Sequence, residues 1–519
     1  MGKSGKRKPR AMTTFGENTA RAKVGKKRKK KRKKGQNSRP VAVEEKSMGS
    51  RGPMPNFLCS TDPKRGEKFF AWLIHPITIP EFMNAHFEKK HLLIKRGYNV
   101  DEADDESKHY YHGWYSTTSI RSALENHAMH YGRDLDLTKF TGGQRKTVNQ
   151  EGRAMGEAVW AKFSGGCSVR ILRPQEYSDK VCGMLALMDE FWGRVSGANA
   201  YLTPSGTQGF APHFDDVDVY ILQLEGRKRW RLYPPRSPND ILPRFSSENL
   251  DPEELPEPIL DTVLNPGDLL YAPRGTIHQA VALPGGPPSL HLTLSSGQRC
   301  TWTDYLSLLL PAAVQIAAES DPSFRESAPR RFGGYMGVVH SDKTDSDTGR
   351  QRAAFKKKVL SLVQKLLDDD HLPIDASVDQ MYREFMHGRV PPLEFIVPEL
   401  KMNRPKIPTE RAKTDSSNDA KGELTATMQI RLVSDGCARL AMEGEAAVLY
   451  FCSTNSRNYK DKDENSLPFA DHCAPALERI LEAFPRYVRI GDLDSLSPEE
   501  QLIVANVLHE NGVVVAKKG

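Results

Sequence analysis

The sequence predicts an α+β protein in which a jelly-roll barrel, that is a double-stranded β-helix, precedes a helical dimerisation region and a winged-helix-like domain. Three observations lead to this class. Short alternating runs bounded by turn residues crowd residues 167–296. Apolar residues repeat at intervals of three and four within residues 301–388, and residues 424–519 mix two helical segments with strand-like runs. A chain of 519 residues has room for about three domains.

Residues 1–55 are expected to form a disordered basic arm. Residues 1–40 hold 17 Lys/Arg and one acidic residue, and nine basic residues follow one another from Lys26 to Lys34. These charges repel one another, and little apolar surface is present to bury. The arm is typical of a nuclear or nucleolar address that also contacts RNA non-specifically; the alternative is a tail that only aids solubility.

The rest of the chain is acidic. Residues 41–519 contain 57 Lys/Arg and 65 Asp/Glu, a net charge of −8, which favours basic partners. The longest apolar run, residues 306–318, is too short for a membrane helix. Seven scattered cysteines without a CxxC pair argue against a disulfide framework or a structural zinc site, and for a reducing compartment.

Residues 56–300 are expected to form the barrel with N-terminal additions, its core covering about 167–313. Helices are predicted over 60–72 and over 79–87, the second with Pro80 near its start. Leu224–Arg227 indicates a hairpin turn and Asn265–Asp268 another tight turn. Strands are predicted over 169–172, 200–202, 219–224, 229–233, 269–271 and 290–294.

Residues 301–400 are expected to be helical and to promote oligomerisation. One helical face carries Tyr305, Leu308, Leu309 and Ala312, and Pro311 is expected to kink this helix. A second apolar repeat runs from Phe355 to Leu366. Such faces favour pairing with a second subunit; the alternative is packing against the same chain's barrel. The polar stretch 341–350 between the helices is predicted to be a loop.

Residues 401–423 are expected to be a linker, and residues 424–519 a winged-helix-like domain. Strands are predicted over 425–432, 446–452 and 513–516, and helices over 469–484 and 498–508, the last beginning with a capping box from Ser497 to Glu500. This domain holds 10 basic and 14 acidic residues, which argues against ordinary duplex-DNA binding.

The sharpest chemical signal is His213-Phe-Asp215, followed 65 residues later by His278. Residues i and i+2 of a strand point the same way, so His213 and Asp215 can share one ligand, and a closed sheet can add His278. Two imidazoles and one carboxylate are the facial triad that holds Fe(II) in oxygenases and leaves positions open for a chelating co-substrate and O₂.

Other candidates are weighed around this triad. Lys228, after the Glu225-Gly226 turn, is placed to bind the far carboxylate of a 2-oxo-acid co-substrate; the alternative is an exposed hairpin lysine. His291 is interpreted as a buried, hydrogen-bonded residue rather than a ligand. His109, His112, His127 and His130 are interpreted as surface histidines.

Several motifs carry a resemblance. They are Ala211-Pro-His-Phe-Asp-Asp216, Leu222-Gln-Leu-Glu-Gly-Arg-Lys-Arg-Trp230, Arg274-Gly-Thr-Ile-His-Gln-Ala280, Ser289-Leu-His-Leu-Thr-Leu-Ser295, Tyr335-Met-Gly-Val-Val-His-Ser341 and Arg489-Ile-Gly-Asp-Leu493. Together they resemble the JmjC ribosomal oxygenases, and most of all the nucleolar type, a bifunctional histidyl hydroxylase and histone lysine demethylase. The resemblance covers nearly everything after residue 55, and it implies a cupin-like JmjC barrel.

The resemblance also implies roles. His213, Asp215 and His278 match the iron ligands, Lys228 the 2-oxoglutarate lysine, and Asn199 a residue beside that co-substrate. Three further residues match positions of the substrate pocket: Arg170, Tyr201 and Ser295.

Three functions follow as hypotheses. The first is Fe(II)- and 2-oxoglutarate-dependent 3-hydroxylation of histidine in a large-subunit ribosomal protein, with Asp216 and Asp218 as rim contacts for a basic substrate. The second is demethylation of methyl-lysine in histone H3, linked to transcription, at the same site; no aromatic cage is obvious in the sequence. The third is a non-enzymatic chromatin or ribosome-assembly scaffold, which the intact ligands and Lys228 disfavour.

Overall fold

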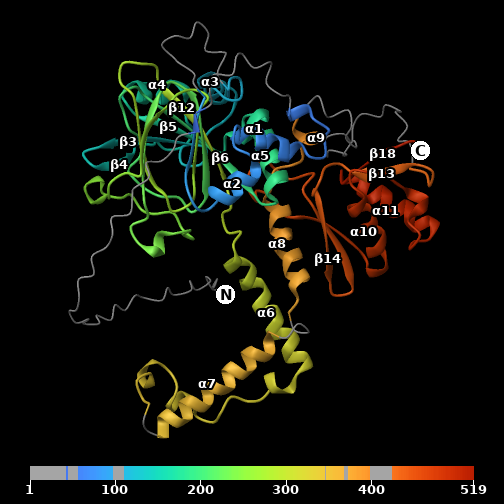
Figure 1. Cartoon of the computed structure of the whole chain (residues 1–519). Coiled ribbons are helices and arrows are strands. Elements are labelled where there is room, and N and C mark those ends of the chain that lie inside the picture. The colour runs from blue at the N-terminus through green and yellow to red at the C-terminus, as the bar shows by residue number, and fades with distance from the viewer. Residues whose placement is uncertain (1–42, 45–56, 97–109, 345–346, 368–371, 398–423) are drawn as a thin grey trace, which may run out of the picture. The chain divides into compact units, whose positions relative to one another are not determined.

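The structure is a computed structural model that describes residues 43–44, 57–96, 110–344, 347–367, 372–397 and 424–519 (Figure 1). The predicted basic arm therefore lies outside the described residues except at strand β1 (Val43–Glu44), which pairs with β2. The predicted linker, 401–423, also lies outside them. No helix in the described part is both long and apolar enough to span a membrane.

The barrel consists of two sheets that face each other. The larger sheet has nine strands in the order β1-β2-β10-β7-β12-β6-β5-β3-β4, all antiparallel except the β1–β2 pair. Its other strands are β2 (Leu92–Lys95), β3 (Leu135–Thr141), β4 (Gln144–Thr147), β5 (Ser168–Leu172), β6 (Ser196–Thr203), β7 (Asp218–Glu225), β10 (Leu269–Ala272) and β12 (Ser289–Ser296).

The smaller sheet has the order β11-β8-β9, with β8 (Lys228–Tyr233), β9 (Leu260–Leu264) and β11 (Ile277–Ala282). Apolar side chains of both sheets meet between them, among them Ile221 of β7, Leu270 of β10 and Leu232 of β8. Two facing antiparallel sheets of this kind confirm the predicted jelly roll.

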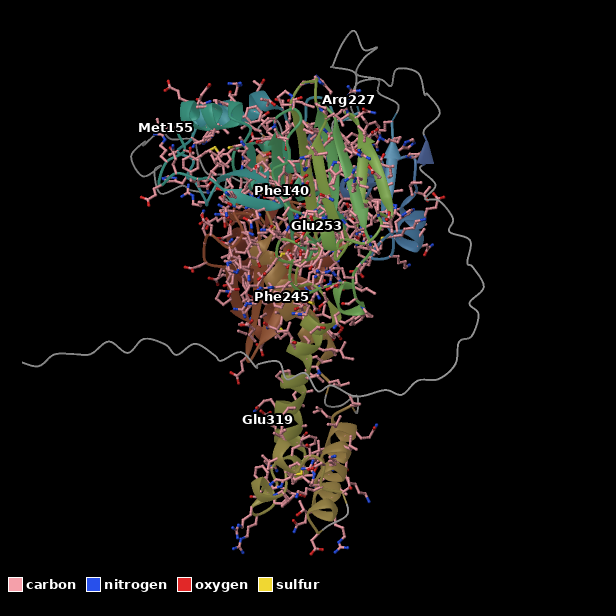
Figure 2. All side chains as sticks on the ribbon, turned by 90° about the vertical axis from the view of Figure 1, so that its left-hand side faces the viewer. Phe140, Met155, Arg227, Phe245, Glu253 and Glu319 are labelled. Carbon is pink, nitrogen blue, oxygen red and sulfur yellow. The ribbon has the colours of Figure 1, made fainter. Side chains whose placement is uncertain are left out.

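The turn at residues 224–227 corrects one prediction. Strands β7 and β8 belong to different sheets, so the turn carries the chain across the barrel and does not close a hairpin. Gly226 has φ of +59°, and a Cβ there would lie 2.3 Å from the carbonyl oxygen of Pro288. Only glycine satisfies both conditions. Arg227 marks this crossing in Figure 2. The tight turn at Asn265–Asp268 is confirmed, and it also joins the two sheets, from β9 to β10.

Helices cover the outer face of the larger sheet (Figure 1). They include α1 (Arg65–Ile74), α2 (Ile79–Ala85) and α5 (Asp179–Trp192); α4 (Gly156–Ser164) packs against β3 and β5, and α3 (Thr117–Asn126) packs against α4. Phe70 of α1 stacks on Phe191 of α5 at 4.0 Å and meets Tyr220 of β7 edge-on. The helix predicted over 60–72 begins five residues later, at Arg65, and a separate 3-10 turn covers Phe57–Cys59. The helix predicted from Ile79 is confirmed, with a capping box from Thr78 to Glu81.

The next segment contains α6 (Trp302–Ser320), α7 (Asp347–Leu366), α8 (Ile374–Gly388) and the short α9 (Leu393–Ile396). Pro311 lies inside α6 and does not end it. The predicted loop 341–350 is too long, because α7 begins at Asp347. Helix α8 packs against β14 and β15 of the C-terminal domain. Helices α6 and α7 keep much apolar surface exposed, at Trp302, Leu306, Leu308, Leu310, Val314, Val359, Leu360 and Val363.

The C-terminal domain contains two small sheets, β17-β13-β18 and β14-β15-β16, and two main helices. Its elements are β13 (Gln429–Leu432), β14 (Ala438–Glu443), β15 (Ala446–Phe451), β16 (Asn465–Ala470), α10 (Ala474–Ala483), β17 (Val488–Arg489), α11 (Pro498–Glu510) and β18 (Val514–Lys517). The capping box of α11 is present, with Ser497 Oγ accepting from the Glu500 backbone. The helix predicted from residue 469 begins at Ala474, because β16 extends to Ala470.

Candidate functional site

The structure brings the three predicted metal ligands together at one end of the barrel. One donor atom from each of His213, Asp215 and His278 lies within 4.8 Å of the other two. The Nε2 atoms of His213 and His278 are 3.8 and 3.7 Å from the two carboxylate oxygens of Asp215. Within the described residues this is the one such group of three metal-binding side chains.

Backbone hydrogen bonds hold the two histidines in place. The His278 amide donates to the His213 carbonyl at 2.8 Å, and the His213 amide donates back at 3.2 Å. The Gly275 amide donates to the Asp215 carbonyl at 3.0 Å. All three ligands are therefore fixed by one short antiparallel bridge between the loop before β7 and the start of β11.

Hydrogen bonds to backbone carbonyls set which nitrogen of each histidine ring faces the metal position. Nδ1 of His213 lies 2.8 Å from the Ala211 carbonyl oxygen, and Nδ1 of His278 lies 3.1 Å from that of Thr276. A carbonyl can only accept, so each Nδ1 carries the proton and each Nε2 keeps its lone pair for a metal. Burial and the neighbouring His213 lower the pKa of His278 to about 4, which keeps this ring neutral.

Lys228 reaches into the cavity from the first position of β8. Its side chain is 5% exposed, and Nζ donates to Thr203 Oγ1 at 2.9 Å. Within the described part of the chain no carboxylate pairs with it, and burial lowers its pKa to about 7. The hairpin-lysine alternative is wrong, and a buried cation without an anion is the partner that a co-substrate carboxylate needs.

The residues matched by resemblance share the cavity-facing side of the larger sheet. Tyr201 lines the cavity, and Asn199 and Thr203, each two residues away on β6, lie on the same face of the strand. Arg170 is directly opposite Tyr201 on β5, and its guanidinium pairs with Asp136. Ser295 is two residues beyond the cavity-lining Thr293 on β12. Asn199, Arg170 and Ser295 thus border the cavity without lining it.

His291 is buried, as expected, and is not part of the ligand group. Its ring stacks on Tyr201, with centroids 4.8 Å apart and 5° between the planes. Its Nδ1 is buried without a hydrogen-bond partner among the described residues. His112 and His127 are exposed and His130 is half-buried; His109 lies outside the described residues.

The two residues predicted as rim contacts, Asp216 and Asp218, differ in burial. Asp216 is half-buried and accepts from Ser246 Oγ at 2.7 Å and from Gln298 at 3.0 Å. Asp218 is fully buried on β7 and accepts from the Tyr271 hydroxyl at 3.0 Å. The prediction for Asp218 is wrong, because the strand turns its side chain into the core.

Two aromatic rings of the cavity wall were not predicted from the sequence. Trp230 lies two residues after Lys228 on β8, so strand alternation could have placed both side chains in the cavity. Phe210 comes from the irregular segment before the first ligand, and its ring centroid is 6.3 Å from that of His213. No sequence periodicity marks such a loop position.

The residues present fit a metal and a 2-oxo acid. Two neutral imidazoles with outward-facing Nε2 atoms and one carboxylate suit Fe(II), and three protein ligands leave coordination positions open. The unpaired Lys228 supplies the cation for a carboxylate at the inner end of the same cavity.

Two family models and many curated proteins match this chain. The JmjC domain model matches residues 170–305, and the model for the ribosomal oxygenase 1 C-terminal winged helix domain matches residues 398–519. Ribosomal oxygenase 1 of Gallus gallus is 39% identical over 455 residues, which cover 88% of this chain and 73% of that protein. The Homo sapiens protein of that name is 40% identical, covering 88% and 68%.

A second set of relatives has a longer name. The bifunctional lysine-specific demethylase and histidyl-hydroxylase NO66 of Branchiostoma floridae is 38% identical, covering 88% of this chain and 68% of that protein. The structure of YcfD, a ribosomal oxygenase from Escherichia coli in complex with cobalt and 2-oxoglutarate, covers 85% of this chain and 99% of that one, with a TM-score of 0.42 and 15% identity.

Proposed function

The chain belongs to the JmjC ribosomal oxygenase family, and from this premise we propose that it hydroxylates a histidine of a large-subunit ribosomal protein at its β-carbon. It is a 2-oxoglutarate-dependent dioxygenase that uses Fe(II) and O₂. The observation that carries the proposal is the joint presence of the His213–Asp215–His278 group and the unpaired Lys228 in one cavity. With these reactants bound, such a site couples decarboxylation of 2-oxoglutarate to succinate and CO₂ with hydroxylation of a C–H bond.

The chain's own residues divide the remaining work. His213, Asp215 and His278 hold the metal, and the two backbone carbonyls behind the rings keep them oriented. Lys228 pairs with the far carboxylate of the co-substrate, and Asn199 borders it. The half-buried ring of Phe210 and the buried ring of Trp230 limit the access of water. Three residues are proposed for substrate contact: Arg170, Tyr201 and Ser295.

A second candidate uses the same site. Relatives named as bifunctional lysine-specific demethylases and histidyl-hydroxylases support demethylation of a methylated lysine. We propose histone H3 as the carrier of that lysine, and with it a role in transcription. Ribosomal proteins and histones are both basic, so the net charge of −8 over residues 41–519 suits either substrate. The scaffold hypothesis is set aside, because the chain is an oxygenase.

We extend the proposal to partners and location. The exposed apolar side chains of α6 and α7 support a homodimer or a higher homo-oligomer, since so much apolar surface is unusual on a monomer. The basic run Lys26–Lys34 supports a nuclear and nucleolar location and non-specific RNA contact. Deleting that run in a fluorescent fusion should release the protein from the nucleolus.

Intact-mass analysis of two peptides tests the proposed reaction. One peptide carries a histidine segment of a large-subunit ribosomal protein, and the other a trimethyl-lysine histone H3 tail; both are incubated with Fe(II), 2-oxoglutarate and O₂. Hydroxylation adds about 16 Da to the first, whereas demethylation removes about 14 Da per methyl from the second. The His213→Ala variant is the control. Methyl loss on the second peptide alone would reverse the ranking of the two reactions.

A further inference from the structure

Three aromatic rings line the cavity beside the metal group: Tyr201, Phe210 and Trp230. A methylated lysine keeps its positive charge, and proteins that recognise such cations offer them open faces of aromatic rings. The state of these three rings therefore bears on which side chain the site admits.

Each ring already has a partner from the chain itself. The Arg145 guanidinium carbon lies over Phe210, 4.3 Å from the ring centroid, with Arg170 at 5.6 Å. Lys228 Nζ lies over Trp230 at 5.8 Å. Tyr201 is stacked on His291. Two rings thus have a cation over one face, and the third has an imidazole against it.

Of the cations that lie over these rings, Arg145 has the shortest distance to a ring centroid. It lies on β4, opposite Phe140 of β3, the residue that marks this hairpin in Figure 2. The residue is half-buried, and its Nε is buried without a hydrogen-bond partner. Nearby Asp136 is bonded to Arg170 and Asn149, and Arg145 has no ion pair within the described residues. Burial and the neighbouring Arg170 lower its pKa.

Contact with Phe210 and the attraction of Asp136 stabilise Arg145, but Asp136 is already bonded to Arg170 and Asn149, and a half-buried cation without an ion pair of its own costs stability. We propose that Arg145 is a specificity-determining residue: it occupies one face of the cavity-lining Phe210 and places a positive charge next to the pocket wall, so that the site admits a neutral imidazole and rejects a methylated ammonium. The inference rests on the proposed function, and it ranks the two proposed substrates by a named residue.

Three variants and two peptides test it. The peptides share one sequence and differ only at the target position, histidine or trimethyl-lysine. Removing one like charge at the pocket wall should raise the trimethyl-lysine to histidine ratio of kcat/KM about tenfold in Arg145→Gln. Arg145→Lys keeps the charge and should behave like the wild type. Lys146→Gln removes the same charge from the next residue of β4, which is exposed, and should leave the ratio unchanged.

An Arg145→Gln ratio equal to that of Lys146→Gln would overturn the inference while leaving the proposed reaction intact. A wild-type enzyme that modifies neither peptide would overturn the proposed reaction instead. In that case calorimetry with the Mn(II)- and 2-oxoglutarate-loaded protein, without O₂, tests Arg145. The Arg145→Gln variant must gain affinity for the trimethyl-lysine peptide relative to the histidine peptide. Equal gains in Arg145→Gln and Lys146→Gln would contradict the role.

Discussion

At the scale of single residues, Lys228 lowers the stability of the co-substrate-free protein and raises its affinity for 2-oxoglutarate. Lys228→Met removes a buried cation that has no carboxylate partner among the described residues, so the co-substrate-free protein should gain about 2 kcal/mol of stability. Its affinity for 2-oxoglutarate should fall by at least about tenfold, because the carboxylate loses its charged partner. Thermal melts with and without 2-oxoglutarate measure both effects. Arg229→Met, an exposed neighbour paired with Asp261, should change neither by much.

The same residue predicts a pH dependence. Its pKa is about 7 in the folded protein and near 10.5 in an unfolded chain, so between these values the unfolded state binds more protons. The Lys228 contribution to stability is complete above about pH 10.5 and is lost as the pH falls through about 7. Binding of 2-oxoglutarate needs the charged form and should weaken as the pH rises above 7. Calorimetric titrations of 2-oxoglutarate between pH 6 and 9 check the sign; affinity that rises with pH would contradict it.

Much of the site follows from local sequence. The spacing of His213 and Asp215, and the position of Lys228 just after a turn, are local features of the sequence, although the two ligands lie in the loop before β7 and not on the predicted strand. Asn199, Arg170 and Ser295 needed a family resemblance, and the structure places them at the border of the cavity. Arg145 and Phe210 are 65 residues apart in the chain, and only the closed barrel brings them together. Pairing across such a distance leaves no periodic signal in one sequence.

At the scale of elements, the turn between β7 and β8 should tolerate no side chain. Gly226→Ala combines a positive φ with a clash against the Pro288 carbonyl and should cost about 3 kcal/mol. Gly285 also has a positive φ, but a Cβ there meets nothing within 4 Å, so Gly285→Ala should cost only about 1 kcal/mol. Chemical denaturation measures the difference; equal losses would show that the clash relaxes.

The strand runs of the barrel were predicted well, because their alternation is local and strong. Their partners were not: the turn at residues 224–227 looks like a hairpin in sequence, yet β7 pairs with β10 and β12. The predicted start of the helix at residue 469 was also wrong, because Phe469 belongs to β16, which pairs with β15. Pairing between strands depends on the whole sheet, which a window of ten residues does not contain.

At the scale of the whole molecule, one buried cation ties distant parts of the chain together. The Arg65 guanidinium of α1 pairs with Glu190 of α5 at 2.7 Å and Glu394 of α9 at 2.8 Å, and it donates to Ser434 of the C-terminal domain. Arg65→Leu leaves two buried carboxylates unpaired and should cost about 4 kcal/mol. The C-terminal domain should then unfold separately in calorimetry. Arg479→Leu, which breaks an exposed pair with Asp494, should cost under about 1 kcal/mol and keep the original transitions.

The backbone bridge between His213 and His278 has a consequence for the living cell. Because the donor atoms are already gathered by hydrogen bonds of the chain, little folding energy is spent on assembling them. A ready-made set of two nitrogens and one oxygen also attracts Co²⁺, Ni²⁺, Cu²⁺ and Zn²⁺, and these bind such donors more tightly than Fe²⁺. Selection of the working metal therefore falls to the cell's supply of each ion, and iron scarcity or zinc excess would silence the enzyme without unfolding it.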